Sequence, residues 1–252
     1  MPYDLQNRRV LVTGSSRGLG ALIAEKFAHV GAHVAVNYVA KRERAEEVAA
    51  RIKEVGKGKV VIVGGDAGVE ADCRRMVQET VEGLGGVDVI VGNAGWTKFS
   101  TFGDLDALSE EDWDKCWAVN VKGQMFLLRA ALPHFNANPD GGVFLITSSI
   151  AGMAPSGSSM AYSVSKAAGL HLMKCLAQTQ GPKVRVNAVS PGLLLTEWGE
   201  NFSPEVIKAM KDKAALKQET NLDDCAESFL AAARNASLTG VNIRVDSGVM
   251  TL

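Results

Sequence analysis

Tyr162 and Lys166 stand four residues apart in the stretch AYSVSKAAG, which has the pattern of a helix start. Residues four apart lie on one helical face, so a phenol and an ammonium could act on a common site. A free tyrosine titrates near pH ~10. An ammonium about 4 Å away contributes about 4 kcal/mol at an effective dielectric of about 20, which equals about three pKa units. The pair predicts a tyrosine that exchanges a proton near neutral pH.

A glycine-rich stretch, TGSSRGLG, holds Gly14, Gly18 and Gly20 between an apolar run and a helical pattern. Such glycines allow a tight turn and let the backbone approach a pyrophosphate at the helix N-terminus, although glycine can also merely close a turn. The same stretch fits the Gly-x-Ser-x-Gly elbow of serine hydrolases, which needs a histidine late in the chain. The last 81 residues contain no histidine. We therefore favour dinucleotide binding over hydrolysis.

The acceptor for the cofactor ribose is expected about 20 residues beyond the glycines, which points to Asn37. An aspartate there would repel the 2′-phosphate of NADP, and asparagine carries no such charge. Arg17 in the loop, with Lys41 and Arg42 further on, could bind the phosphate, although Lys41 and Arg42 equally fit a solvated helix start. The sequence predicts that NADP(H) is preferred and that NAD(H) use is possible.

The chain around these residues alternates short apolar runs with longer amphipathic ones. The runs rich in Val and Ile are RVLVTG, HVAVNY, KVVIVGGD, VDVIVGNAG, GGVFLITSS, VRVNAVSPG and GVNIRVDSG. They are continuous rather than alternating, as in strands covered on both faces. This rhythm predicts one α/β domain over residues 1–252, a Rossmann-type doubly wound parallel sheet of about seven strands with helices on both faces. In such a sheet ligands bind beyond the carboxyl ends of the strands.

Several motifs appear in one order along nearly the whole chain. They are TGSSRGLG at 13–20, NAG at 93–95, Asn120, Ser149, Tyr162-x-x-x-Lys166 and Pro191-Gly192. This set resembles the short-chain dehydrogenase/reductase family in its compact form, and 3-oxoacyl-carrier-protein reductases most of all. The resemblance implies hydride transfer between a nicotinamide cofactor and a carbonyl or secondary alcohol. A non-catalytic NADP-binding sensor on the same fold is the alternative, but it would be expected to lose the tyrosine or the lysine.

The resemblance implies a role for each catalytic residue. Tyr162 would be the general acid/base, Lys166 would lower its pKa and hold the nicotinamide ribose, and Ser149 would polarise the substrate carbonyl. Asn120 would support a proton relay, although a side-chain hydrogen bond that bends its helix is an ordinary alternative. Ser148 competes with Ser149, and strand alternation lets only one of them face the site. The family's spacing favours Ser149.

The resemblance also implies which residues contact the ligands. The cofactor contacts would be Gly14, Ser16, Arg17, Gly18, Leu19, Gly20, Asn37, Asp66, Ala67, Asn93, Ala94, Gly95, Tyr162, Lys166, Pro191, Gly192, Leu194 and Thr196. The substrate contacts would be Ser149, Tyr162, Trp96, Met153 and Trp198. Asp66 could equally cap the helix that follows it. Gly92, Leu195 and Ser247 depart from the family pattern, which usually has asparagine, a polar residue and glycine at these positions.

Composition narrows the possible partners. The net charge of -1 gives no footprint for nucleic acid or an anionic membrane, so we expect a small-molecule carbonyl or alcohol substrate. The four cysteines form no Cys-x-x-Cys pair, and we expect no metal. The sequence has no apolar stretch of about 18 residues, so it predicts no membrane span. No signal-peptide core follows the start, so we expect a cytoplasmic protein. The resemblance implies a homotetramer or homodimer through helices near 110–135 and 162–180.

Overall fold

The computed structural model describes residues 3–251, and strands from the whole of this range form one seven-stranded sheet in the order β3-β2-β1-β4-β5-β6-β7. The strands are β1 (Arg9–Val12), β2 (His33–Tyr38), β3 (Val60–Gly64), β4 (Val89–Gly92), β5 (Gly142–Thr147), β6 (Val184–Pro191) and β7 (Asn242–Val245). Every neighbouring pair is parallel. The strand order reverses between β1 and β4, which confirms the doubly wound prediction and marks the switch point where ligands bind.

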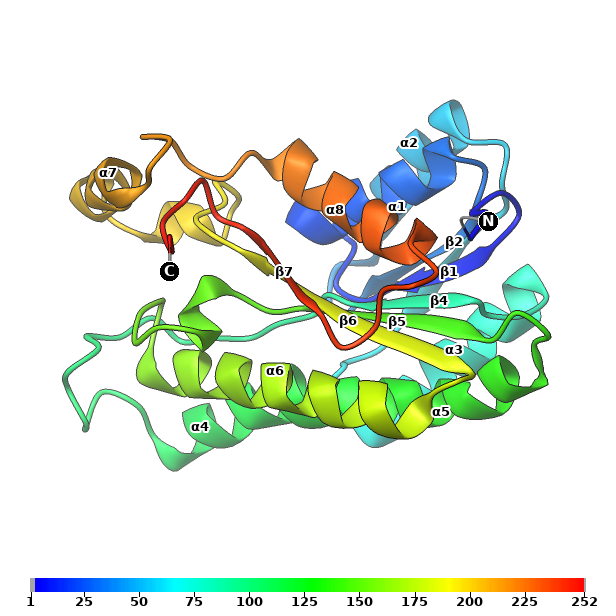
Figure 1. The fold of residues 1–252 in the computed structure, drawn as a ribbon, viewed down its shortest axis with the longest axis horizontal. Helices are drawn as coiled ribbons and strands as arrows, with labels where there is room; N and C mark the ends of the chain where they lie inside the picture. The colour runs from blue at the N-terminus through cyan, green and yellow to red at the C-terminus, as the bar shows by residue number, and fades with distance from the viewer. Residues whose placement is uncertain (1–2, 252) are drawn as a thin grey trace.

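Helices cover both faces of the sheet (Figure 1). One face carries α1 (Gly18–His29), α2 (Arg42–Val55) and α8 (Leu222–Arg234), and the other carries α3 (Glu70–Leu84), α4 (Glu110–Trp117), α5 (Gly123–Ala137) and α6 (Met160–Gln180). Adjacent residues of β1 pack into opposite layers, Val10 and Val12 beneath α1 and α8, and Leu11 beneath α3 and α5. Because both faces are buried, the strands read as unbroken apolar runs.

The segments that follow the carboxyl ends of the strands gather at one end of the sheet, where α7 (Pro204–Lys213) also lies (Figure 1). The start of α6 is fixed locally, because the Ser159 hydroxyl caps the helix by accepting a 3.2 Å hydrogen bond from the backbone N–H of Tyr162. Between α4 and α5 the chain forms a π-helical turn, η1 (Ala118–Lys122). Such turns occur often at functional sites. In residues 3–251 no helix is long and apolar enough to span a bilayer.

Candidate active site

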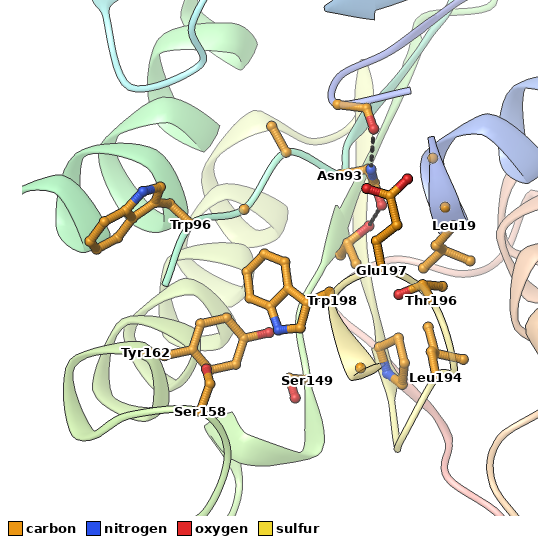
Figure 2. Close-up of a pocket in the computed structure, with 18 of the residues that line it drawn as sticks. Leu19, Asn93, Trp96, Ser149, Ser158, Tyr162, Leu194, Thr196, Glu197 and Trp198 are labelled. Atoms are coloured by element: carbon orange, nitrogen blue, oxygen red, sulfur yellow. Dashed lines mark hydrogen bonds between the residues drawn. The ribbon is translucent and has the colours of Figure 1, made fainter. Parts of the chain in front are cut away.

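A cleft of about 650 Å³ runs across this end of the sheet, from the glycine loop to Tyr162. Figure 2 shows Leu19 and Thr196 on one side of it and Tyr162, Ser149 and Trp198 on the other. All the residues that we predicted to contact the cofactor line the cleft except Asn37. Trp96 and Trp198, predicted to contact substrate, line it as well.

The glycine loop has a backbone that only glycine accommodates easily. Gly14 and Gly18 have φ values of +62° and +56°, in the left-handed region. A Cβ on Gly20 would lie 2.5 Å from the carbonyl oxygen of Gly14, so α1 packs directly on the loop. The loop therefore presents bare backbone at a helix N-terminus, which suits the pyrophosphate of a dinucleotide.

Asn37 corrects the predicted ribose contact. Its side chain is fully buried, and its Oδ1 accepts a 2.8 Å hydrogen bond from the backbone N–H of Gly14. Its Nδ2 lies 3.1–3.2 Å from the carbonyl oxygens of Tyr38, Val63 and Gly65, which share its two N–H groups. These hydrogen bonds hold the glycine loop against β2, and they leave the Asn37 side chain no free donor for a ligand. The next residue, Tyr38, lines the cleft instead, because neighbouring strand residues point to opposite faces.

Positive charge collects where the cleft passes α2. Arg17, Lys41 and Arg44 line it there. Arg42, a candidate for phosphate binding, instead pairs with Glu46 along α2, with Nε and Oε1 2.9 Å apart. Arg44 was missed, although it follows Lys41 by three residues and so shares its helical face. This part of the cleft thus has three cations and one carboxylate, that of Glu197, while position 38 carries a tyrosine.

The loops after β3 and β4 form the floor of the cleft. Asn93 ties neighbouring strand ends together: its Nδ2 donates to the carbonyl oxygen of Thr13 at 3.0 Å, and its Oδ1 accepts from the Thr147 hydroxyl at 3.2 Å. Asp66 forms a 2.5 Å ion pair with Lys115, and its other oxygen accepts from the backbone N–H of Gly68. Asp66 thus shapes its own loop and faces the cleft.

The residues predicted to transfer protons meet at the far end of the cleft. Lys166 is buried, and its Nζ lies 5.4 Å from the ring centroid of Tyr162 while donating a 2.7 Å hydrogen bond to the carbonyl oxygen of Thr147. The hydroxyl of Ser149 is near enough to Tyr162 to lower the pKa of the phenol, and it also accepts a 3.1 Å hydrogen bond from the backbone N–H of Ala151. Ser148 points away, toward the backbone carbonyl of Lys166. Both competing serines line the cleft, and Ser149 is the one that affects the pKa of Tyr162, so the choice of Ser149 stays a prediction.

The electrostatics of the pair differ from the sequence expectation. Burial raises the pKa of Tyr162 above its ordinary value, and the hydrogen bond with Ser149 lowers it by a smaller amount. Burial also lowers the pKa of Lys166 to about 8. We predicted that the lysine would depress the tyrosine pKa. Removing both groups from water instead disfavours both charged forms.

Asn120 sits at the centre of the π-helical turn and lies outside the cleft lining. Its Oδ1 accepts from the N–H of Trp96 at 2.9 Å, and its Nδ2 donates to the carbonyl oxygen of Trp96 and to the hydroxyl of Ser165, each at 2.9 Å. Its side chain therefore joins the loop after β4 to α6. These contacts are with other elements, and one more, from Nδ2 to the sulfur of Cys116 at 3.2 Å, is with the preceding turn at the end of α4.

The substrate end is mainly aromatic. The rings of Trp198 and Tyr162 are 5.6 Å apart between centroids, and Phe202, which lines the cleft, contacts Phe99 edge to face at 5.0 Å. Met153 corrects a predicted substrate contact. It is 41 % exposed, outside the cleft lining, and its sulfur accepts a 3.2 Å hydrogen bond from Asn242. The short turn η2 (Ile150–Gly152) carries it toward β7.

Comparisons with known proteins agree with this geometry. Residues 14–250 match the family model described as enoyl-(acyl carrier protein) reductase. The chain is 38% identical over 244 residues to a protein of Streptomyces violaceoruber named as a ketoacyl reductase of the granaticin polyketide synthase, covering 96% of both chains. It is 34% identical over 252 residues to human dehydrogenase/reductase SDR family member 4, covering 97% of this chain and 88% of that one. The chain belongs to the short-chain dehydrogenase/reductase family.

A solved relative shares the whole architecture. The short-chain dehydrogenase of Burkholderia cenocepacia J2315, crystallised with NADP, superposes with a TM-score of 0.89 at 31% identity and covers 98% of this chain and 99% of that one. As a short-chain dehydrogenase/reductase, the protein is an oxidoreductase acting between CH–OH and C=O groups with a nicotinamide cofactor. Within residues 3–251 no group of three or more His, Cys, Asp or Glu side chains could hold a metal ion.

Two departures from the short-chain dehydrogenase/reductase pattern have structural explanations. A Cβ at Gly92 would collide with the side-chain oxygen of Gln124, so the glutamine fills the space of the usual asparagine. Ser247 has φ +52°, which explains why glycine is usual there, and its hydroxyl donates to the carbonyl oxygen of Glu219 at 2.9 Å. Leu195 is 38 % exposed beside the cleft.

Proposed function

We propose that the protein is an NADP(H)-dependent oxidoreductase that transfers hydride between nicotinamide and a carbonyl or secondary-alcohol substrate. The observation that supports this is one cleft with two chemically distinct ends. Tyr162, Ser149 and Lys166 gather at one end, and Arg17 and Arg44 line the other. The glycine loop between them fits the pyrophosphate that would join the two halves of the cofactor.

The proposed roles follow from the side chains present. A bound nicotinamide would supply or accept the hydride. The Tyr162 hydroxyl would protonate the substrate oxygen during reduction, and its raised pKa keeps that proton in place at neutral pH. Ser149 would donate a hydrogen bond to the same oxygen. Lys166 would hold the nicotinamide ribose, and Asn120 would position Trp96 and α6 around them.

The cations near α2 support a preference for NADPH. A charge-assisted hydrogen bond to the 2′-phosphate is worth about 1.5–3 kcal/mol, or roughly ten- to a hundredfold in affinity. Position 38, which lines this part of the cleft, is a tyrosine and so does not add a carboxylate that would repel the phosphate. We therefore expect NADPH to bind at least tenfold more tightly than NADH, and Arg17→Ala to reduce that ratio.

The test is loss of absorbance of the reduced nicotinamide with a panel of ketones, aldehydes and ketoacyl thioesters. Tyr162→Phe should bind NADPH as the parent does, since only the hydroxyl is removed, and should lose turnover by about 100-fold or more. A Phe variant that keeps most of its turnover would show that Tyr162 is not the acid.

We also propose a homodimer or homotetramer. Trp113 and Trp117 on α4 and Val164 on α6 are 37 %, 42 % and 45 % exposed, on helices within the predicted interface. Exposed large apolar side chains of this kind often mark protein contacts. The single domain over residues 1–252 and the cytoplasmic location stay predictions.

A further inference from the structure

Glu197 joins the two arginines at the α2 end of the cleft. One of its carboxylate oxygens lies 2.5 Å from Nη1 of Arg17, and Nη1 of Arg44 lies 2.9 and 3.0 Å from its two oxygens. Glu197 follows β6 and lines the cleft together with both arginines. Figure 2 shows its carboxylate directed toward the side of the cleft that holds Asn93, away from Tyr162.

This carboxylate uses two of the three cationic groups near α2 that a 2′-phosphate could bind. Arg17 and Arg44 are the guanidinium groups that line the cleft within residues 3–251, and both are paired with Glu197. A phosphate monoester offers more charge and three acceptor oxygens to the same donors. The ion pairs lie near water, because the side chains of Arg17 and Glu197 are 59% and 53% exposed. Exposed ion pairs of this kind are weak and can be displaced.

We propose that Glu197 is a specificity-determining residue, an internal competitor that the 2′-phosphate of NADP displaces from Arg17 and Arg44. The inference rests on the proposed NADP(H) function. NADH has a hydroxyl in place of the phosphate and can bind while the ion pairs persist. Glu197 therefore reduces the affinity for NADPH and leaves that for NADH nearly unchanged.

Glu197 is linked to the catalytic end of the cleft through its neighbour in the chain. Trp198, the next residue, packs on Tyr162 with ring centroids 5.6 Å apart. Displacing Glu197 frees the segment that carries Trp198. A ligand that occupies only the arginine end is therefore expected to change the surroundings of Trp198.

The test compares Glu197→Gln with the parent by titration calorimetry against NADPH and NADH. Glutamine keeps the shape and removes the charge, so the dissociation constant for NADPH should fall about threefold to tenfold, while that for NADH should change less than about twofold. Glu200→Gln is the matched control, because Glu200 is exposed three residues further on and forms no ion pair among the described residues. It should change neither constant.

Two further arms locate the effect. The gain in NADPH affinity from Glu197→Gln should disappear when Arg17 and Arg44 are both alanine. Adenosine 2′,5′-bisphosphate should shift tryptophan fluorescence in the parent and not in a Trp198→Phe variant, whereas adenosine 5′-diphosphate should shift neither.

An unchanged NADPH constant in Glu197→Gln would overturn the inference, and so would weaker NADH binding, which would make Glu197 a ribose acceptor. These results are separable from failure of the proposed function. If the parent protein bound neither cofactor, the proposed function would be wrong. If the parent bound and turned over NADPH normally but Glu197→Gln left both dissociation constants unchanged, only the proposed competition by Glu197 would be wrong.

Discussion

Asn37→Asp and Tyr38→Asp place the same carboxylate one residue apart, and the structure predicts opposite outcomes. Asn37 is fully buried, and its Nδ2 donates to three backbone carbonyl oxygens and lies 2.9 Å from the sulfur of Met76. An aspartate at this position would place a carboxylate oxygen, which can only accept hydrogen bonds, against these carbonyl oxygens and the sulfur. It would keep one N–H donor, from Gly14.

The cost can be estimated from these contacts. Each buried polar group left without a partner costs about 1–3 kcal/mol, and a buried unpaired charge costs about 3–5 kcal/mol, so we expect a loss of about 3–5 kcal/mol. For a chain of this length, Tm falls by about 2–4 °C per kcal/mol, which gives a decrease of roughly 6–20 °C. Binding of both cofactors should weaken together, since the bond from Gly14 positions the glycine loop.

Tyr38→Asp is the matched control. Its side chain faces the cleft and is half-buried, so Tm should change by only a few degrees, and the carboxylate should repel the 2′-phosphate and accept from a ribose hydroxyl. The preference should move from NADPH toward NADH. Thermal melts and cofactor titrations measure both effects. An Asn37→Asp variant with the parent Tm and an inverted preference would refute this assignment of the two residues.

The remaining predictions concern the catalytic end and assembly. Ser149→Ala should lower turnover with little change in NADPH affinity, while Ser148→Ala should be milder, and the reverse order in steady-state kinetics would mean that Ser148 faces the substrate. Lys166 releases its proton near pH 8 when folded and near 10.5 when unfolded, so raising pH across this interval should stabilise the parent relative to Lys166→Met. Urea unfolding at pH 7 and 9.5 measures that difference, and a constant difference would contradict the buried ammonium. Light scattering should give a mass above the 26.7 kDa monomer, and the monomer mass alone at micromolar concentration would exclude the proposed assembly.

The parts of the site that depend on local rules could be predicted from the sequence. The glycine loop follows a strand and opens a helix, and Tyr162 and Lys166 share one turn of α6. Their positions need only helix periodicity and a parallel sheet. Arg44 was within reach of the same reasoning, because it lies one helical turn beyond Lys41.

Other parts needed three-dimensional information. The phase of β2 cannot be read from HVAVNY, because both faces of this strand are buried and neither is polar throughout. The ribose contact was therefore assigned to Asn37 instead of Tyr38. Glu197 meets Arg17 and Arg44 across 180 and 153 residues, and no periodicity reports such a contact. Met153 was misplaced because a short turn redirects the chain after β5.

Burial gives the Tyr162–Lys166 pair a chemical direction that spacing alone does not show. Desolvation disfavours the phenolate and the ammonium alike, so it raises the tyrosine pKa and lowers that of the lysine to about 8. A neutral tyrosine carries the proton that carbonyl reduction requires, but its raised pKa makes it a weaker acid, which positive charge from a bound cofactor would offset. Alcohol oxidation requires the phenolate, which becomes more abundant as pH rises. The unliganded protein thus provides the neutral tyrosine that the proposed reduction would use near neutral pH, whereas oxidation would depend on charge brought to the pair by pH or by a cationic ligand.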